Sequence, residues 1–157
     1  EVLFLPPRPE DALLGADRRM EVEAALSLRG EARQLAKGRL ASVERLLDLP
    51  PEQGDNQAER LYRALLGLVS QSPRALLLDE PTARVGPDAR RWINRALLRL
   101  RAEGLVVVVA THDPELVRLA DEVSIIADGH VLPGSLRQAI VDGILRAPEL
   151  GRALDLA

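Results

Sequence analysis

The sequence contains no cysteine, a single lysine, and one each of phenylalanine, tyrosine and tryptophan among its 157 residues. Without cysteine the chain can form no disulfide and offers no thiolate to a metal. Three aromatic side chains are too few for a surface that stacks single-stranded nucleic acid. The longest apolar run, residues 105–110, has the length of a buried strand and falls far short of the roughly 18–20 residues that cross a bilayer.

What is present is the composition of a soluble globular domain. Hydrophobic residues make up 46% and charged residues 29%, and the net charge is −3. This length is sufficient for one domain with a buried core. The slightly negative charge gives no reason to expect nucleic acid or an anionic membrane surface as a partner. No secretory signal is visible, since the short segment 1–5 begins with an acidic residue and is followed at once by prolines. The lack of cysteine suits a cytosolic protein.

The apolar patterning predicts an α/β domain. Strands are expected at Val2–Leu5, 75–78, 105–110 and 123–127, the last turned by Asp128-Gly129 toward Val131. Helices are expected at residues 20–28, 31–49, 87–101, 114–120 and 135–145, and from a cap at Asp55 or Asn56 to about residue 70. Continuous apolar strands that alternate with helices are typical of a parallel sheet covered on both faces, and all four strands are expected in one sheet.

Two carboxylates, Asp79 and Glu80, directly follow the expected strand 75–78. Open α/β sheets bind their ligands at the carboxyl ends of the strands. There, one acid can hold Mg²⁺, usually through water, while the other polarises an attacking water. Taken alone, the pair is more simply interpreted as a solvated acidic turn that ends at Pro81.

A second polar group follows the next expected strand, which ends in Thr111-His112-Asp113-Pro114. Taken alone, His112 is a loop residue, and Asp113 caps a helix that begins at Pro114. Adjacent parallel strands end at the same edge of a sheet, however, so we expect the Glu80 and His112 side chains within roughly 10 Å of each other. A histidine there can hydrogen-bond a γ-phosphate.

These residues carry a family resemblance. Residues 75–134, which include LLLDEPTARVGPDARR and THDPELVRLADEVSIIADGHVLPG, resemble the Walker B, D-loop and switch-histidine region of ABC-type ATPases. The runs FLPPRPEDALLG and MEVEAAL resemble the Q-loop region of the energy-coupling-factor subgroup, which drives uptake of vitamins and of cobalt or nickel. The tail VLPGSLRQAIVDGILRAPEL also suits that subgroup.

The resemblance implies one partial ABC ATPase domain with a P-loop NTPase-like fold. Its parts would be a helical subdomain over residues 20–70, a core over 71–134 and a helical tail over 135–157. The chain would be an ATP-hydrolysing subunit of an ABC transporter, with Asp79 on Mg²⁺, Glu80 as the catalytic base and His112 as the switch. Its partners would be a second ABC ATPase subunit, in a homo- or heterodimer, and a transmembrane subunit, but no nucleic acid. Its place would be cytoplasmic, at the inner face of the cell membrane.

Several positions depart from the family pattern. The Q-loop glutamine falls on Pro7 and the D-loop aspartate on Gly86. Counted back from Walker B without gaps, the signature Leu-Ser-Gly-Gly-Gln/Glu falls on Asp55, Asn56, Gln57, Ala58 and Glu59. A two-residue insertion moves it to residues 53–57. Neither register keeps the serine and the glycine pair, and an aspartate there would repel a γ-phosphate.

The sequence also has no P-loop. That loop needs Gly-Lys-Ser/Thr, and the single lysine, Lys37, lies between Ala36 and Gly38. In the family the P-loop precedes the Q-loop, so the resemblance implies that roughly the first third of the domain is absent here. We therefore expect ATP and Mg²⁺ to bind only when a P-loop is supplied.

Two alternatives stay open. The first is a degenerate, non-hydrolytic ABC-like subunit that binds or regulates, which the altered positions favour and the intact Asp79, Glu80 and His112 oppose. The second is a soluble ABC protein of DNA repair or translation. For that class, long coiled coils or basic linkers are expected, and the sequence shows neither.

Overall fold

A computed structural model describes residues 1–31, 33–52, 54–127 and 130–133. The chain divides into two compact units, Glu1–Thr111 and His112–Ala157. The expected helix 135–145 and the Asp128-Gly129 turn lie outside the described residues. Within the described ranges, no helix combines the length and apolar character that a membrane span requires.

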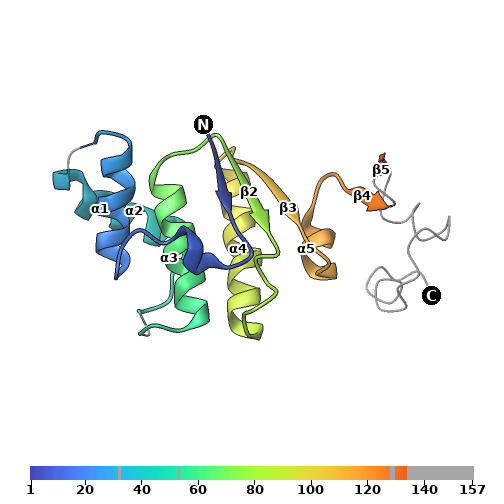
Figure 1. The fold of residues 1–157 in the computed structure, drawn as a ribbon, viewed down its shortest axis with the longest axis horizontal. Coiled ribbons are helices and arrows are strands. Elements are labelled where there is room, and N and C mark those ends of the chain that lie inside the picture. Colours follow the sequence, from blue (N-terminus) through green and yellow to red (C-terminus); the bar gives the residue numbers. More distant parts are fainter. Residues whose placement is uncertain (32, 53, 128–129, 134–157) are drawn as a thin grey trace. The chain divides into compact units, whose positions relative to one another are not determined.

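The first unit is built on a three-stranded parallel sheet in the order β1-β2-β3 (Figure 1). Its strands are β1 (Val2–Leu5), β2 (Ala75–Asp79) and β3 (Val106–Ala110). Helix α4 (Pro87–Ala102) connects β2 to β3, because parallel neighbours need a crossover. The predicted α/β class, the parallel pairing of the two central strands and the membership of β1 in their sheet are confirmed.

The strand register decides which residues share an edge. Leu5 pairs with Leu78, and Asp79 pairs with Ala110. All three strands therefore point their carboxyl ends toward one edge of the sheet. We call this the carboxyl edge.

The other helices of the first unit lie between β1 and β2 in the chain. They are the 3-10 helices η1 (Pro9–Ala12) and η2 (Arg33–Leu35) and the α-helices α1 (Arg18–Leu28), α2 (Ala36–Leu47) and α3 (Gln57–Ser70). Side-chain caps fix two of their starts: Asp17 accepts from the Met20 N–H at 2.7 Å, and Asn56 accepts from the Glu59 N–H at 2.9 Å. The expected cap at Asn56 is thus confirmed. The helix expected from residue 31 begins later, because residues 33–35 form a 3-10 turn.

Helices cover one face of this sheet. Leu5, Leu76 and Leu78 point to that face and are buried. Helix α3 lies against β1 and helix α4 against β3, and both helices bury apolar side chains such as Leu65 and Ile93. Each fully buried side chain of this kind contributes about 1.5–3 kcal/mol to folding.

The opposite face of the sheet remains open to solvent. Its side chains alternate with the buried ones and include Phe4, Leu77 and Val108, which are exposed. The prediction of a sheet covered on both faces is therefore met on one face only. Because the strands carry apolar residues on both faces, the sequence predicted a layer of helices on each face. The described residues form such a layer on one face.

Helices α1 and α3 pack closely because a glycine lies at their contact. A Cβ atom on Gly67 would come within 2.5 Å of Glu21 Oε1. Glu21 is buried, and its carboxylate accepts the N–H groups of Leu14 and Gly15, both at 2.8 Å. This carboxylate ties the loop before α1 to the helix pair.

The second unit contains helix α5 (Pro114–Leu119) and a two-stranded antiparallel sheet of β4 (Ser124–Ala127) and β5 (His130–Pro133). The prediction that strand 123–127 joins the parallel sheet is wrong, because β4 pairs with β5 instead. Two residues connect Ala127 to its partner His130, and such a short link can join only antiparallel neighbours.

The buried Glu21 carboxyl predicts a pH dependence of stability. Burial raises its pKa above the ordinary value of 4.5, against the lowering effect of the two N–H groups and of Arg63. Because the folded-state pKa is the higher one, this group's contribution to stability is full below about pH 4.5. It is lost as the pH rises through the folded-state pKa.

We therefore expect Glu21→Gln to flatten the fall in the free energy of unfolding between about pH 4.5 and neutral pH, measured by urea denaturation. Glu23→Gln is the matched control on the same helix, since Glu23 pairs with the exposed Arg19. The control should keep the wild-type slope. Equal slopes for wild type and Glu21→Gln would contradict this account of the carboxyl.

Candidate functional site

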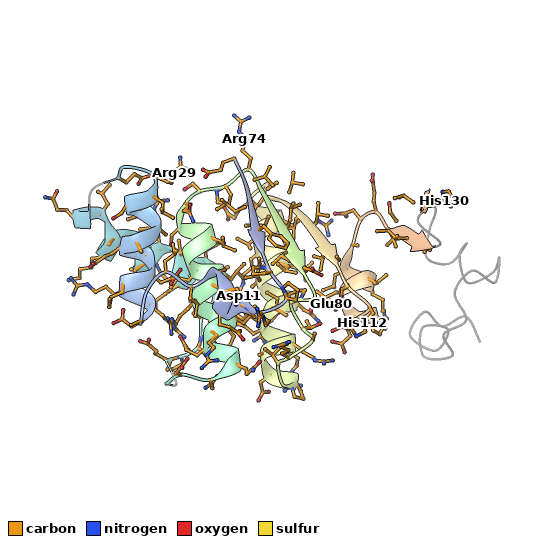
Figure 2. The ribbon with its side chains drawn as sticks, viewed as in Figure 1. Asp11, Arg29, Arg74, Glu80, His112 and His130 are labelled. Atoms are coloured by element: carbon orange, nitrogen blue, oxygen red, sulfur yellow. The ribbon has the colours of Figure 1, made fainter. Side chains whose placement is uncertain are left out.

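The predicted acidic pair lies at the carboxyl edge. Asp79 is the last residue of β2, and Glu80 follows it directly. Figure 2 shows Arg74 and Glu80 at opposite ends of this strand. Pro7 follows the end of β1 by two residues and Thr111 directly follows β3, so both leave the sheet at the same edge. The structure thus brings the expected Q-loop position and both acids to one edge.

The backbone of Glu80 adopts an uncommon conformation. Its φ is 47°, in the left-handed region that non-glycine residues avoid. Two backbone hydrogen bonds hold it there: the Glu80 N–H donates to the Ala110 carbonyl at 2.9 Å, and the Glu80 carbonyl accepts from the Ala83 N–H at 3.1 Å. Such a conformation costs on the order of 1 kcal/mol and often marks a functional site.

The Glu80 carboxylate is oriented by a residue from the neighbouring strand. The Thr111 hydroxyl donates to Glu80 Oε2 at 3.3 Å. The sequence pattern alone does not point to Thr111, although the pairing of Asp79 with Ala110 places the residues that follow the two strands side by side. A hydroxyl donor holds this oxygen of the carboxylate in place.

Asp79 has the chemistry of a Mg²⁺ ligand but not a full set of protein partners. The described residues contain no group of three or more His, Cys, Asp or Glu that could hold a metal. Magnesium commonly binds through one or two carboxylates and completes its shell with water and substrate phosphates. The pair therefore fits a Mg²⁺ ion that arrives with a phosphate-bearing ligand.

His112 is the first residue of the second unit. Asp113 beside it caps α5 by accepting the Glu115 N–H at 3.0 Å, as the sequence predicts. Because Glu80 belongs to the first unit, the expected distance between the Glu80 and His112 side chains stays a prediction.

The positions expected for the signature and the D-loop meet at a separate cleft. Asn56, Ala58, Glu59 and Gly86 are among the residues that line a space of about 600 Å³. It lies at the N-terminal ends of helices α3 and α4. In the gapless register Asn56 stands at the signature serine, and Gln53 of the other register lies outside the described residues.

The aspartate in this segment carries a paired charge. Arg60 donates to both Asp55 oxygens, at 2.9 and 2.7 Å, and this hydrogen bonding lowers the Asp55 pKa. Asp55 therefore stays ionised at neutral pH, but a guanidinium neutralises much of its charge. The repulsion of a phosphate expected from the sequence is weakened accordingly.

Glu59, at the last signature position, is buried in an ion pair. Arg18 of α1 donates to both of its oxygens, at 2.7 and 2.8 Å, and also to the Pro50 carbonyl. Both side chains are almost fully buried. This pair could not be predicted from the sequence pattern, because 41 residues separate its members. Arg18 thereby anchors α1 to the first turn of α3.

Comparison with known proteins identifies the fold. No family model matches the chain. The solved structure of cbiO1 from Clostridium perfringens, part of the ABC transporter complex cbiONQ, superposes with a TM-score of 0.74 and 21% identity. It covers 98% of this chain and 67% of that chain. A dimeric post-hydrolysis structure of the ATP-binding cassette MJ0796, bound to ADP and Pi, gives a TM-score of 0.71 at 21% identity. That match covers 87% of this chain and 63% of the other. The chain therefore has the ABC ATPase fold.

Curated relatives point to the same family. The energy-coupling factor transporter ATP-binding protein EcfA of Methanosphaera stadtmanae is 30% identical over 100 residues, which cover 59% of this chain and 36% of that protein. The lipoprotein-releasing system ATP-binding protein LolD of Maricaulis maris is 37% identical over 96 residues, 60% of this chain and 41% of that protein. Over the matched residues the chain is similar to part of the ATP-binding proteins of ABC transporters. It spans less than half the length of these two relatives.

Substitutions in the Arg18–Glu59 pair test whether this ion pair stabilises the residues that line the cleft. Arg18→Met should lower the free energy of unfolding by about 3 kcal/mol, because it leaves the Glu59 carboxylate buried without its cation. Arg19→Met is the matched control, since that side chain is 77% exposed, and should change stability by less than about 0.5 kcal/mol. The double variant Arg18→Met/Glu59→Leu should recover most of the loss. Similar small effects of both single variants in chemical denaturation would contradict a buried, stabilising pair.

Proposed function

We propose that this chain supplies the water-activating half of an ATP site in an ABC transporter ATPase, and that hydrolysis there drives transport. The observation that carries the proposal is the acidic pair Asp79-Glu80 at the carboxyl edge, with Glu80 oriented by Thr111. Open parallel sheets bind ligands at this edge. A paired metal carboxylate and water-activating carboxylate is what phosphoryl transfer to water requires.

Each residue has a distinct role in this proposal. Asp79 holds Mg²⁺, which neutralises phosphate charge when bound. Glu80 accepts the proton of the water that attacks the γ-phosphorus, while the bond to the leaving ADP oxygen breaks. His112 hydrogen-bonds the γ-phosphate and responds to its loss. Thr111 positions the Glu80 carboxylate without contacting the substrate.

The phosphates need a further binding element. This sequence has no Gly-Lys-Ser/Thr, and those backbone donors and the lysine normally hold the phosphates. We therefore propose that ATP binds where a P-loop segment joins the carboxyl edge. The partners proposed are a second ABC ATPase subunit and a transmembrane subunit at the cytoplasmic face of the membrane. The dimeric MJ0796 structure and the transporter complex that contains cbiO1 are precedents for such assemblies. The match to EcfA supports the energy-coupling-factor subgroup.

A non-hydrolytic binding or regulatory subunit is the second candidate. The specific observations in its favour are Pro7 at the Q-loop position and a signature segment without its serine and glycine pair. The two candidates differ in the role of Glu80. Only the hydrolytic one needs its carboxylate to accept a proton.

The isolated chain should bind Mg-ATP weakly. Without a P-loop it lacks the donors that hold the β- and γ-phosphates, so titration calorimetry should show no saturable binding below about millimolar ATP. Binding at micromolar concentration would contradict the proposed division of the site. Mg-ADP serves as the control ligand, because it lacks the γ-phosphate but carries the same base and sugar.

With a P-loop segment supplied, hydrolysis should depend on Glu80. Glu80→Gln should lower turnover by about 100-fold or more and leave the ATP dissociation constant within about threefold, because it removes the base and not a phosphate ligand. Glu103→Gln, at the end of α4, is a matched control that should keep wild-type turnover. Equal turnover in wild type and Glu80→Gln would remove Glu80 from the role of catalytic base.

A further inference from the structure

The turn that joins β2 to α4 carries an arginine close to the acidic pair. This turn spans residues 80–86, and we call it the β2–α4 turn. Arg84 follows Glu80 in it by four residues. Arg84 is exposed, and within the described residues its side chain makes no hydrogen bond or ion pair. Its guanidinium is therefore available to a ligand.

The β2–α4 turn is fixed on both sides of Arg84. Before it, the Glu80 carbonyl accepts from the Ala83 N–H at 3.1 Å. After it, Val85 is buried, and its carbonyl accepts from Arg90 Nε at 3.3 Å. The position from which Arg84 extends is thus set by the same turn that holds Glu80 in its left-handed conformation.

The carboxyl edge otherwise carries negative charge. Asp79 and Glu80 lie there, and the phosphates of a bound nucleotide would add to it. In the segments that directly follow β1, β2 and β3, the structure describes two arginines, Arg8 and Arg84. Arg8 is paired with Asp11 at 2.9 Å. The positive charge of Arg84 is therefore the one that a partner has not already offset.

The two charges of the β2–α4 turn stay apart. The Glu80 carboxylate accepts from the Thr111 hydroxyl and forms no pair with Arg84. Arg91, at the start of α4, shows the structural alternative, since it pairs with Asp88. Separate charges suit a site in which the carboxylate activates water and the guanidinium binds phosphate, because a pair between them would neutralise both.

We propose that Arg84 binds the terminal phosphate of the nucleotide and stabilises the charge of this group as it is transferred to water. A guanidinium is planar and can donate two parallel N–H groups to two phosphate oxygens. Arginines that reach the transferring phosphoryl group raise turnover by orders of magnitude in other nucleotide hydrolases. This inference rests on the proposed function, and it adds a catalytic residue that supplies positive charge from this chain itself.

The first experiment uses the full chain alone. The probe is inorganic tripolyphosphate with Mg²⁺, titrated through the millimolar range and followed by ¹⁵N NMR. The Arg84 Nε–H and the Ala83 amide signals should shift as the probe binds. Arg84→Ala should weaken this binding at least about tenfold, because it removes a charge-assisted pair of hydrogen bonds.

The matched control is Arg74→Ala. Arg74 is also exposed, and its side chain also lacks a partner within the described residues. It lies at the other end of β2, six residues or about 20 Å from Glu80 (Figure 2). This variant should bind the probe as the wild type does. Since both substituted side chains are exposed, circular dichroism should show that each variant keeps the fold.

The second experiment measures turnover with a P-loop segment supplied. Arg84→Ala should lower turnover by about 100-fold, more than it lowers affinity, because the charge that it stabilises develops in the transition state. Guanidinium ion, at concentrations too low to unfold the protein, should restore part of this loss, and sodium ion should not. Arg74→Ala should keep wild-type turnover.

Probe binding and turnover that fall in Arg84→Ala but not in Arg74→Ala support the proposal. Probe binding that Arg84→Ala leaves unchanged overturns it, and so does wild-type turnover in that variant. The failure of the proposed function looks different. Probe binding that depends on Arg84, together with turnover that is absent or independent of Glu80, would refute the proposed function and leave the phosphate contact of Arg84 intact.

Discussion

The hydrogen-bonded ladder between β2 and β3 determines where this chain can do chemistry. Because the strands are parallel and Asp79 pairs with Ala110, everything that follows either strand leaves at one edge. The ladder also continues one residue further, through the bond from the Glu80 N–H to the Ala110 carbonyl. That bond helps hold Glu80 in its left-handed conformation and sets its carboxylate beside the Thr111 hydroxyl. A change in this register would separate the acids from Thr111.

The same register gives the two faces of the sheet different surroundings. One face buries Leu76 and Leu78 against the helices, and this packing holds the strands in place. The other face ends in Asp79 and presents apolar side chains to solvent. The acidic pair and these exposed apolar side chains are therefore adjacent parts of one surface. The cleft beside Asn56 and Gly86 is a separate feature, built by the N-terminal ends of α3 and α4.

The features that could be predicted from the sequence are those that depend on local patterns of residues. The strand 75–78 with its acids, the Asn56 cap and the Asp113 cap all depend on neighbours a few residues away, and each was recognisable. Thr111 beside Glu80, Arg18 with Glu59 and the buried Glu21 were missed, because each contact joins segments that only the tertiary fold brings together. The assignment of strand 123–127 to the main sheet failed for a related reason. An apolar run shows that a strand is present but not which strand it pairs with, and the short link to β5 decided the pairing.

The central claim is that the ATP site of this chain forms at the carboxyl edge, and the position of the metal tests it most directly. Mn²⁺ can replace Mg²⁺, and its unpaired electrons broaden the NMR signals of nearby amides. With ATP and a phosphate-binding segment present, we expect strong broadening at Leu78 and Ala110, at the ends of β2 and β3. Asp79→Ala should abolish it, and Ala58 in the cleft should stay sharp. Broadening centred on Ala58, or unchanged broadening in Asp79→Ala, would contradict the account.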